Sequence, residues 1–216
     1  MSRWNADTRT LAIDAILARA PVVPVLTIDR VEDAVPLAEA LAGGGLPVLE
    51  VTLRTRDALD AITRIARAVP HAVVGAGTVL TPQQLRDTAN AGAAFAIAPG
   101  ASPALYDAAD DATIPFIPAV ATASEIMQGL ARGHRRFKLF PAAAVGGAVA
   151  LKAFAGPFPD VKFCPTGGID AAMAKTLLAL PNVICVGGSW MVPADALASR
   201  DYTRIAALAH EAAHLR

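Results

Sequence analysis

The chain has 216 residues, of which 54% are hydrophobic and 18% charged, and this balance excludes a disordered or fibrous protein. Its 19 basic residues equal its 19 acidic ones, so no excess of positive charge points to nucleic acid or an anionic membrane as a partner. We expect one domain spanning residues 1–216, because this length suits a single large core.

The apolar segments of the chain predict neither export nor a membrane span. The N-terminal segment has no apolar stretch that could serve as a signal peptide. The longest uncharged stretch, residues 176–194, is interrupted by prolines and glycines. Cys164 and Cys185 lie in apolar runs without disulfide or metal-ligand spacing, so we expect buried free thiols in a cytoplasmic protein.

Eight short apolar runs, rich in β-branched residues, recur along the chain with helical segments between them. The runs cover residues 22–28, 48–54, 72–79, 95–99, 115–120, 136–140, 162–166 and 183–187. Their starts lie about 20 to 26 residues apart, which leaves room for one crossover helix in each interval. The pattern is typical of parallel strands that alternate with helices.

Helix start signals stand between these runs: Thr81-Pro82, Ser102-Pro103, and Asp170 before an apolar segment. A further helix is expected over residues 7–18, ahead of the first strand. We therefore predict an α/β fold, a single TIM (β/α)8 barrel with an extra N-terminal helix. The alternative is an open doubly wound sheet, and the placement of polar residues favours the barrel.

Charged residues interrupt the apolar pattern of the second run. Its alternate apolar residues form one face, while Glu50, Thr52 and Arg54 share the other and would point into a barrel near its C-terminal end. Two opposite charges in that place favour a ligand site, and a structural ion pair between them is the alternative.

One lysine stands out among the four in the chain. Lys138 is placed inward on the sixth run, between Phe137 and Leu139, whereas the other three have solvent-facing positions. Burial disfavours its ammonium form, and a nearby cation such as Arg54 would act in the same direction. The neutral amine attacks carbonyl carbons, so Lys138 is the candidate nucleophile.

Glycine pairs follow the last two runs, in C-P-T-G-G-I-D and V-G-G-S-W. Glycines let backbone N–H groups approach an anion closely, and the hydroxyls of Thr166 and Ser189 can add donors. Loops after the seventh and eighth strands of a TIM barrel commonly hold phosphate. Each pair alone would indicate a tight turn, but both together predict a phosphate site at Gly167, Gly168, Gly188 and Ser189.

Two further motifs are rejected as functional sites. G-A-G-T at residues 75–78 lacks the third glycine and the acidic residue of a dinucleotide fingerprint, and Thr78 is better placed to donate to a substrate carboxylate. H-E-x-x-H at residues 210–214 leaves no chain for a third zinc ligand. His71 and His134 are expected to be structural. We predict neither a metal nor a cofactor.

Together, P-V-V-P-V, L-E-V-T-L-R-T, V-G-A-G-T-V-L, F-K-L-F-P-A, F-C-P-T-G-G-I and G-G-S-W-M-V-P-A-D resemble the 2-keto-3-deoxy-6-phosphogluconate (KDPG) aldolases, also described as 4-hydroxy-2-oxoglutarate (KHG) aldolases. The resemblance covers nearly the whole chain. It implies a homotrimeric, metal-independent class I aldolase. Such an enzyme would cleave KDPG to pyruvate and glyceraldehyde 3-phosphate, and KHG to pyruvate and glyoxylate.

The resemblance also implies residue roles. Lys138 would form a Schiff base with C2 of pyruvate, Glu50 would transfer protons, and Arg54 and Thr78 would bind the carboxylate with Thr166 nearby. The phosphate would contact Gly167, Gly168 and Ser189. The remaining expected contacts are Phe140 and Pro99 for the substrate and Gly188 for the phosphate.

Three positions depart from the family pattern: Ala119, Ala143 and Val145 stand where glycine, glutamate and asparagine are expected. None is a proposed catalytic position, so they bear on substrate preference. Three rival functions stay open: an aldolase for an isomeric substrate such as the phosphogalactonate analogue, a metal-dependent phosphosugar epimerase, and a non-catalytic binder of sugar phosphate.

Overall fold

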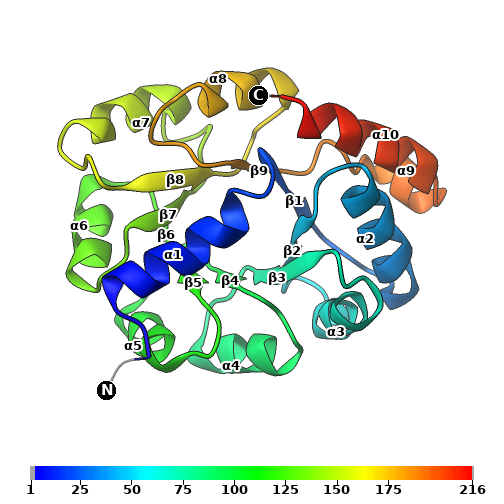
Figure 1. The fold of residues 1–216 in the computed structure, drawn as a ribbon, viewed down its shortest axis with the longest axis horizontal. Coiled ribbons are helices and arrows are strands. Elements are labelled where there is room, and N and C mark those ends of the chain that lie inside the picture. Colours follow the sequence, from blue (N-terminus) through cyan, green and yellow to red (C-terminus); the bar gives the residue numbers. More distant parts are fainter. Residues whose placement is uncertain (1–2, 216) are drawn as a thin grey trace.

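Short parallel strands occupy the centre of the molecule in the computed structural model, which describes residues 3–215 (Figure 1). The strands are β1 (Val22–Leu26), β2 (Val48–Thr52), β3 (Val73–Gly77), β4 (Ala96–Ile97), β5 (Phe116–Ile117), β6 (Ala119–Val120), β7 (Arg136–Leu139), β8 (Lys162–Pro165) and β9 (Val186–Gly188). Each overlaps one of the eight predicted runs, and the fifth run contains two strands.

Helices surround these strands, and α1 crosses in front of them in Figure 1. The α-helices are α1 (Ala6–Leu17), α2 (Ala34–Gly43), α3 (Ala58–Ala68), α4 (Pro82–Asn90), α5 (Pro103–Asp111), α6 (Ala123–Ala131), α7 (Gly147–Ala155), α8 (Ala171–Leu178), α9 (Ala194–Ala198) and α10 (Tyr202–Ala213), and a 3-10 turn, η1 (Val31–Asp33), precedes α2. The additional helix expected at residues 7–18 is therefore present as α1.

The strands form two parallel sheets, in the orders β5-β4-β3-β2-β1-β9 and β6-β7-β8. The prediction of a closed eight-stranded TIM barrel is therefore wrong. Pro118 divides the fifth run, because proline has no N–H with which to continue a ladder, and the two halves join different sheets. At the other junction, β8 and the β9 region are linked only by isolated bridges, Phe163 with Val183 and Thr166 with Gly187.

The predicted helix starts are confirmed by their caps. The Thr81 side chain accepts a hydrogen bond from the N–H of Gln84 at the start of α4. The Ser102 hydroxyl accepts one from Leu105 in α5, and Asp170 accepts one from Met173 in α8. Each cap satisfies a backbone donor that the first turn of a helix leaves unpaired, so these residues place the helices that separate the strands.

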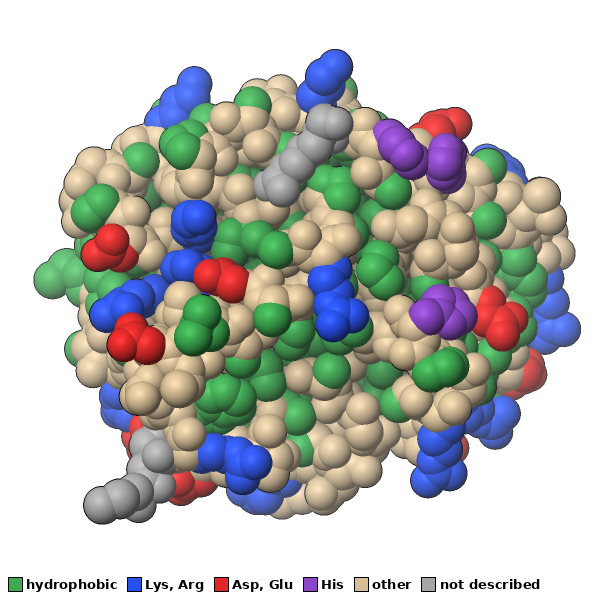
Figure 2. Space-filling model, in the orientation of Figure 1, with side chains coloured by type: hydrophobic (Ala, Val, Ile, Leu, Met, Phe, Trp, Pro, Cys, Tyr) green, Lys and Arg blue, Asp and Glu red, His purple; other side chains and the backbone are tan. Residues whose placement is uncertain are grey.

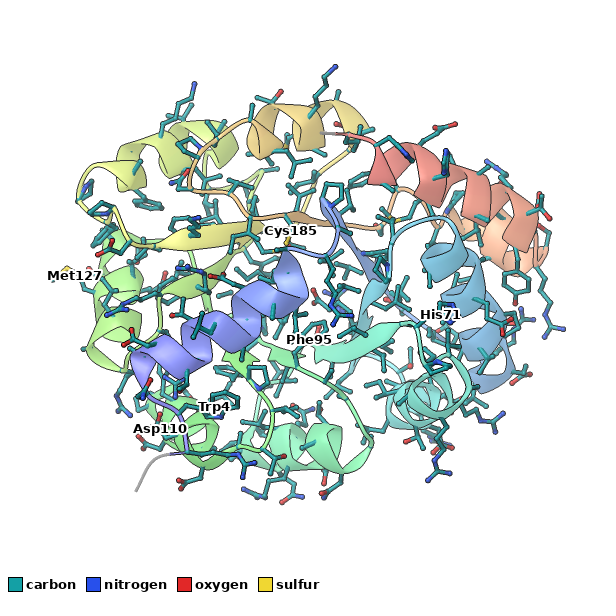
Figure 3. The ribbon with its side chains drawn as sticks, in the orientation of Figure 1. Trp4, His71, Phe95, Asp110, Met127 and Cys185 are labelled. Atoms are coloured by element: carbon teal, nitrogen blue, oxygen red, sulfur yellow. The ribbon has the colours of Figure 1, made fainter. Side chains whose placement is uncertain are left out.

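A small apolar cluster lies between α1 and the strands. Ile13 and Leu17 of α1 pack there with Phe95, Cys164 and Cys185, all at most 1% exposed. Figure 3 shows Phe95 and Cys185 near the centre of the molecule, beside the C-terminal half of α1. Both cysteines are buried, as the sequence predicts. The first helix thus covers one end of the strands and leaves the other end for a site.

Among residues 3–215, no helix is both long enough and apolar enough to cross a membrane. Acidic and basic side chains are interspersed on the face that Figure 2 shows, without one extended patch of either sign.

The ring of a histidine that lies just before β7 is buried without a polar partner among the described residues. The ring of His134 is 1% exposed, and its centroid lies 5.1 Å from that of Tyr106 and 6.1 Å from that of Phe116. Neither ring nitrogen has a hydrogen-bond partner within residues 3–215. Burial, and then the charges of Arg9 and Arg132, lower the pKa of His134 from 6.5 to about 3.

Acid should therefore destabilise the fold through His134. Its pKa is lower in the folded state, so the stability from the neutral ring is complete above the unfolded pKa of 6.5 and is lost as the pH falls toward 3. His134→Leu should flatten the pH dependence of the unfolding free energy between these values by up to about 1.4 kcal/mol per pH unit. Urea unfolding at several pH values measures the slope, and equal slopes in both proteins would contradict the assignment.

Candidate active site

Two residues of opposite charge, 88 positions apart in the chain, meet inside the molecule. The Nζ atom of Lys138 lies 2.8 Å from Oε1 of Glu50, and the two side chains are 6% and 1% exposed. Lys138 stands on β7 and Glu50 on β2, so one comes from each sheet. A buried amine beside a buried carboxylate can exchange a proton without the help of solvent.

The backbone of the second sheet holds Lys138 in place. In the ladder it stands opposite Ala119 of β6 and Cys164 of β8. Its N–H donates to the carbonyl of Pro118 at 3.0 Å, the residue that divides the two sheets. The ring of Phe140 lies 5.4 Å from Nζ, within the range of a cation–π contact. The lysine side chain therefore starts from a fixed strand and is bordered by an aromatic ring.

Glu50 has one unpaired oxygen. Its Oε1 accepts from Lys138, whereas Oε2 is buried and has no hydrogen-bond partner within residues 3–215. Thr52, on the same strand, is occupied by the fold, because its hydroxyl donates to the carbonyl of Leu26 at 2.9 Å. A buried carboxylate oxygen without a partner is unfavourable unless a ligand supplies a donor. Glu50 is thus available to a substrate hydroxyl.

Arg54 does not pair with Glu50. It follows the end of β2, its side chain is exposed, and no ion pair among residues 3–215 includes it. The alternative of a structural Glu50–Arg54 pair is therefore wrong, and the sequence did not reveal that the partner of Glu50 is Lys138. Arg54 remains an accessible cation at the edge of the site.

A cavity of about 220 Å³ opens at the ends of β2, β7, β8 and β9. It brings together most of the residues that the sequence singles out for binding. They are Arg54, Phe140, Thr166, Gly167, Gly168, Gly188 and Ser189. The cavity combines a cation, hydroxyl groups and glycine-rich backbone, which is the chemistry that an anionic ligand requires.

Two of the cavity glycines need conformations that other residues rarely adopt. Gly167 has φ +102° and Gly168 φ +70°, so the chain after β8 turns through the left-handed region. A side chain at Gly188 would overlap the ring of Trp190. Gly167 and Gly168 therefore form a turn, as the alternative reading held, whereas Gly187 and Gly188 belong to strand β9. Both pairs line the cavity.

Two predicted binding residues lie outside the cavity lining. Thr78 directly follows β3, with φ 59°, and Pro99 follows β4, and both are half-buried. Sequence reasoning also missed two glycines under the site. A Cβ atom on Gly77 would overlap the Glu50 carboxylate, and one on Gly187 would overlap the Thr166 hydroxyl. The alternation G-A-G in β3, which leaves one strand face without side chains, was the available signal.

His210 of H-E-x-x-H lies in the last turn of α10 and His214 directly follows the helix, and both are exposed. The helix α10 lies at the periphery of the molecule (Figure 1). His210 and His214 have ring centroids 4.3 Å apart. Within residues 3–215, no three His, Cys, Asp or Glu side chains gather in a way that could hold a metal ion.

Comparison with known proteins supports a single family. The sequence model described as KDPG and KHG aldolase matches residues 13–208. A KHG/KDPG aldolase of Escherichia coli K12 is 57% identical over 98% of this chain and 97% of its own length. A 2-dehydro-3-deoxy-phosphogluconate aldolase of Dickeya dadantii shows the same identity and coverage. The chain belongs to the KDPG and KHG aldolase family, which confirms the resemblance of its motifs.

A solved structure agrees with this membership. The KDPG aldolase of Legionella pneumophila, with pyruvate captured as a covalent carbinolamine intermediate, superposes with a TM-score of 0.91. It is 50% identical, and the match covers 93% of this chain and 97% of that one. Members of the family are lyases that break a carbon–carbon bond.

Proposed function

We propose that this chain cleaves KDPG to pyruvate and glyceraldehyde 3-phosphate through a Schiff base on Lys138, and also cleaves KHG to pyruvate and glyoxylate. The observation that carries the proposal is the buried contact of 2.8 Å between Lys138 Nζ and Glu50 Oε1. The names of the relatives and the pyruvate adduct of the Legionella enzyme support it. Neither cleavage reaction requires a metal ion in this proposal.

Formation of the imine begins with a proton transfer. Glu50 accepts a proton from Lys138, and the neutral amine then attacks C2 of the keto acid. The new Nζ–C2 bond gives a carbinolamine, whose hydroxyl leaves as water once it is protonated. The product is a protonated imine. Its positive charge lies next to C3 and can accept the electron pair of the C3–C4 bond.

Glu50 then acts as the base for bond cleavage. It takes the proton of the C4 hydroxyl, directly or through one water, while the C3–C4 electron pair moves into the imine and leaves an enamine. The aldehyde, glyceraldehyde 3-phosphate, departs with C4. Glu50 returns a proton to C3 of the enamine, and water hydrolyses the imine to release pyruvate. Lys138 and Glu50 end in their starting states.

We assign the two ends of the substrate to different groups of residues. In this proposal Arg54, Thr78 and Thr166 bind the carboxylate, with Phe140 and Pro99 against the carbon chain. The glycines and Ser189 bind the phosphate. Arg54 and Thr166 share one cavity with these glycines, which supports the placement of both ends in a single site. Residues 1–216 then act as one aldolase domain.

One departure from the family pattern lies where it can affect substrate preference. Ala143 borders the phosphate end, because a Cβ atom on Gly168 would lie 2.8 Å from its Cβ. An isomeric sugar acid is the rival substrate, and pyruvate release from a panel of phosphorylated and unphosphorylated keto acids separates the two. We also propose that the protein is a cytoplasmic homotrimer, and this part of the proposal rests on the family resemblance alone.

A homotrimer should have three times the 22.2 kDa mass of one chain. Light scattering coupled to size exclusion measures this mass without assumptions about shape. A single species with the mass of one or two chains would contradict the trimer, while leaving the chemistry of the site unaffected.

Borohydride should lock pyruvate onto Lys138, because the imine is a reducible C=N bond. Reduction in the presence of pyruvate should abolish activity, whereas borohydride alone should not. Lys138→Arg keeps the charge but cannot act as the amine nucleophile, so it should neither trap pyruvate nor turn over. Peptide mapping by mass spectrometry identifies the modified residue. An adduct on Lys152, Lys162 or Lys175 would overturn the assignment.

Ser189→Asp should repel a dianionic phosphate and leave the pyruvate end intact. We expect kcat/KM for KDPG to fall by roughly 10- to 100-fold, and kcat/KM for KHG, which has no phosphate, to change little. Ser189→Asn is the matched neutral control, because the asparagine side chain has nearly the same shape as aspartate but carries no charge. Steady-state pyruvate release from both substrates provides the comparison, and equal losses on both would count against a phosphate site here.

A further inference from the structure

The face of β3 toward Glu50 has no side chains at two successive positions, Gly75 and Gly77. The Glu50 carboxylate occupies the space over Gly77. A Cβ atom on that glycine would overlap Oε1 of Glu50 and would lie 2.7 Å from its Cγ and 2.8 Å from its Cδ. All three of the nearest atoms belong to Glu50, so a methyl group there would meet the carboxylate before anything else.

The backbone of β3 is fixed against β2, so it cannot yield. Glu50 stands opposite Gly75 in the ladder, and Thr52 stands opposite Gly77. The N–H of Leu53 donates to the carbonyl of Gly77 at 2.8 Å. With a side chain at residue 77, the carboxylate would therefore have to move. Because Glu50 is 1% exposed, it cannot swing into solvent, and its contact with Lys138 is the one that would be lost.

We propose that Gly77 is a positioning residue that holds the Glu50 carboxylate within proton-transfer distance of Lys138 and of the reacting carbons. It touches no substrate atom. It acts by leaving open the space in which the carboxylate lies across β3 and reaches the amine on the other sheet. The inference rests on the proposed role of Glu50 as the acid and base of the reaction.

The test uses a readout that belongs to Glu50. Pyruvate bound as an enamine exchanges its methyl hydrogens with D₂O, and NMR measures that exchange separately from imine formation. Gly77→Ala should still trap pyruvate with borohydride, but kcat and the exchange rate should fall by about 10²-fold, the effect of misplacing a catalytic group by about 1 Å.

The decisive comparison is made in the Glu50→Gln background. Glu50→Gln alone should reduce turnover and exchange by about 10² to 10⁴-fold. It should still form the adduct on long incubation, because water can take the Lys138 proton more slowly in place of Glu50. If Gly77 acts through Glu50, adding Gly77→Ala to Glu50→Gln should change the exchange rate little. Equal slowing by Gly77→Ala in both backgrounds would overturn the inference. Wild-type exchange in Glu50→Gln would instead remove the proposed role of Glu50, so the two failures are distinguishable.

Gly75→Ala is the matched control on the same strand face. Its Cβ would lie 2.5 Å from the ring of Phe95, and the three nearest atoms all belong to that ring. This variant overpacks the core without meeting the carboxylate first, so it should lower the unfolding temperature and keep exchange near the wild-type rate. Loss of exchange in Gly75→Ala as large as in Gly77→Ala would mean that general overpacking explains both.

A stability measurement covers the case in which Gly77→Ala does not fold. Glu50→Ala removes all three atoms that the new methyl group would meet. The double variant Glu50→Ala/Gly77→Ala should therefore melt at or above the temperature of Glu50→Ala alone, although Gly77→Ala by itself destabilises the protein. A double variant that melts below Glu50→Ala by the full effect of Gly77→Ala would show that residue 77 is not coupled to Glu50.

Discussion

The buried ion pair between Lys138 and Glu50 is the constraint on which the rest of this structure depends. Removing one partner of such a pair destabilises a protein by about 3–5 kcal/mol, because the other charge remains in a low-dielectric environment. The fold must therefore deliver both side chains to one point from strands in different sheets. The same arrangement supplies chemistry, since the carboxylate that stabilises the ammonium is also the nearest group that can remove its proton.

Small residues and breaks in the ladder make room for this pair. Gly77 leaves space for Glu50, and Gly187 leaves space for the Thr166 hydroxyl beside the cavity. Pro118 ends one sheet and begins the other, yet its carbonyl accepts from the N–H of Lys138. The interruption that prevents a continuous barrel ladder thus lies next to the lysine that needs a fixed backbone. These breaks in regularity border the site, where geometry matters more than the number of hydrogen bonds.

Much of the site could be predicted from local patterns. Two-residue alternation in short apolar runs placed Glu50 and Lys138 on interior strand faces, and both are buried. The glycine pairs after the last two strands line one cavity with Arg54, as expected for one binding site. The errors were in pairing. Glu50 was expected to meet a ligand or Arg54, but its partner is Lys138, 88 positions away in the chain. A local sequence pattern cannot show which distant strand will become a neighbour.

The sequence by itself determined the helices, the approximate strands, the inward-facing charged residues and, through its motifs, the aldolase family. These properties are local: a cap, an alternation or a glycine turn depends on neighbours a few residues away. Only the tertiary structure decided that the strands form two sheets, that Arg54 stays unpaired in the described part of the chain, and that Glu50 lies over Gly77 against Lys138. Those outcomes depend on which strands become neighbours and on the space between their side chains, and both arise only when distant segments pack together.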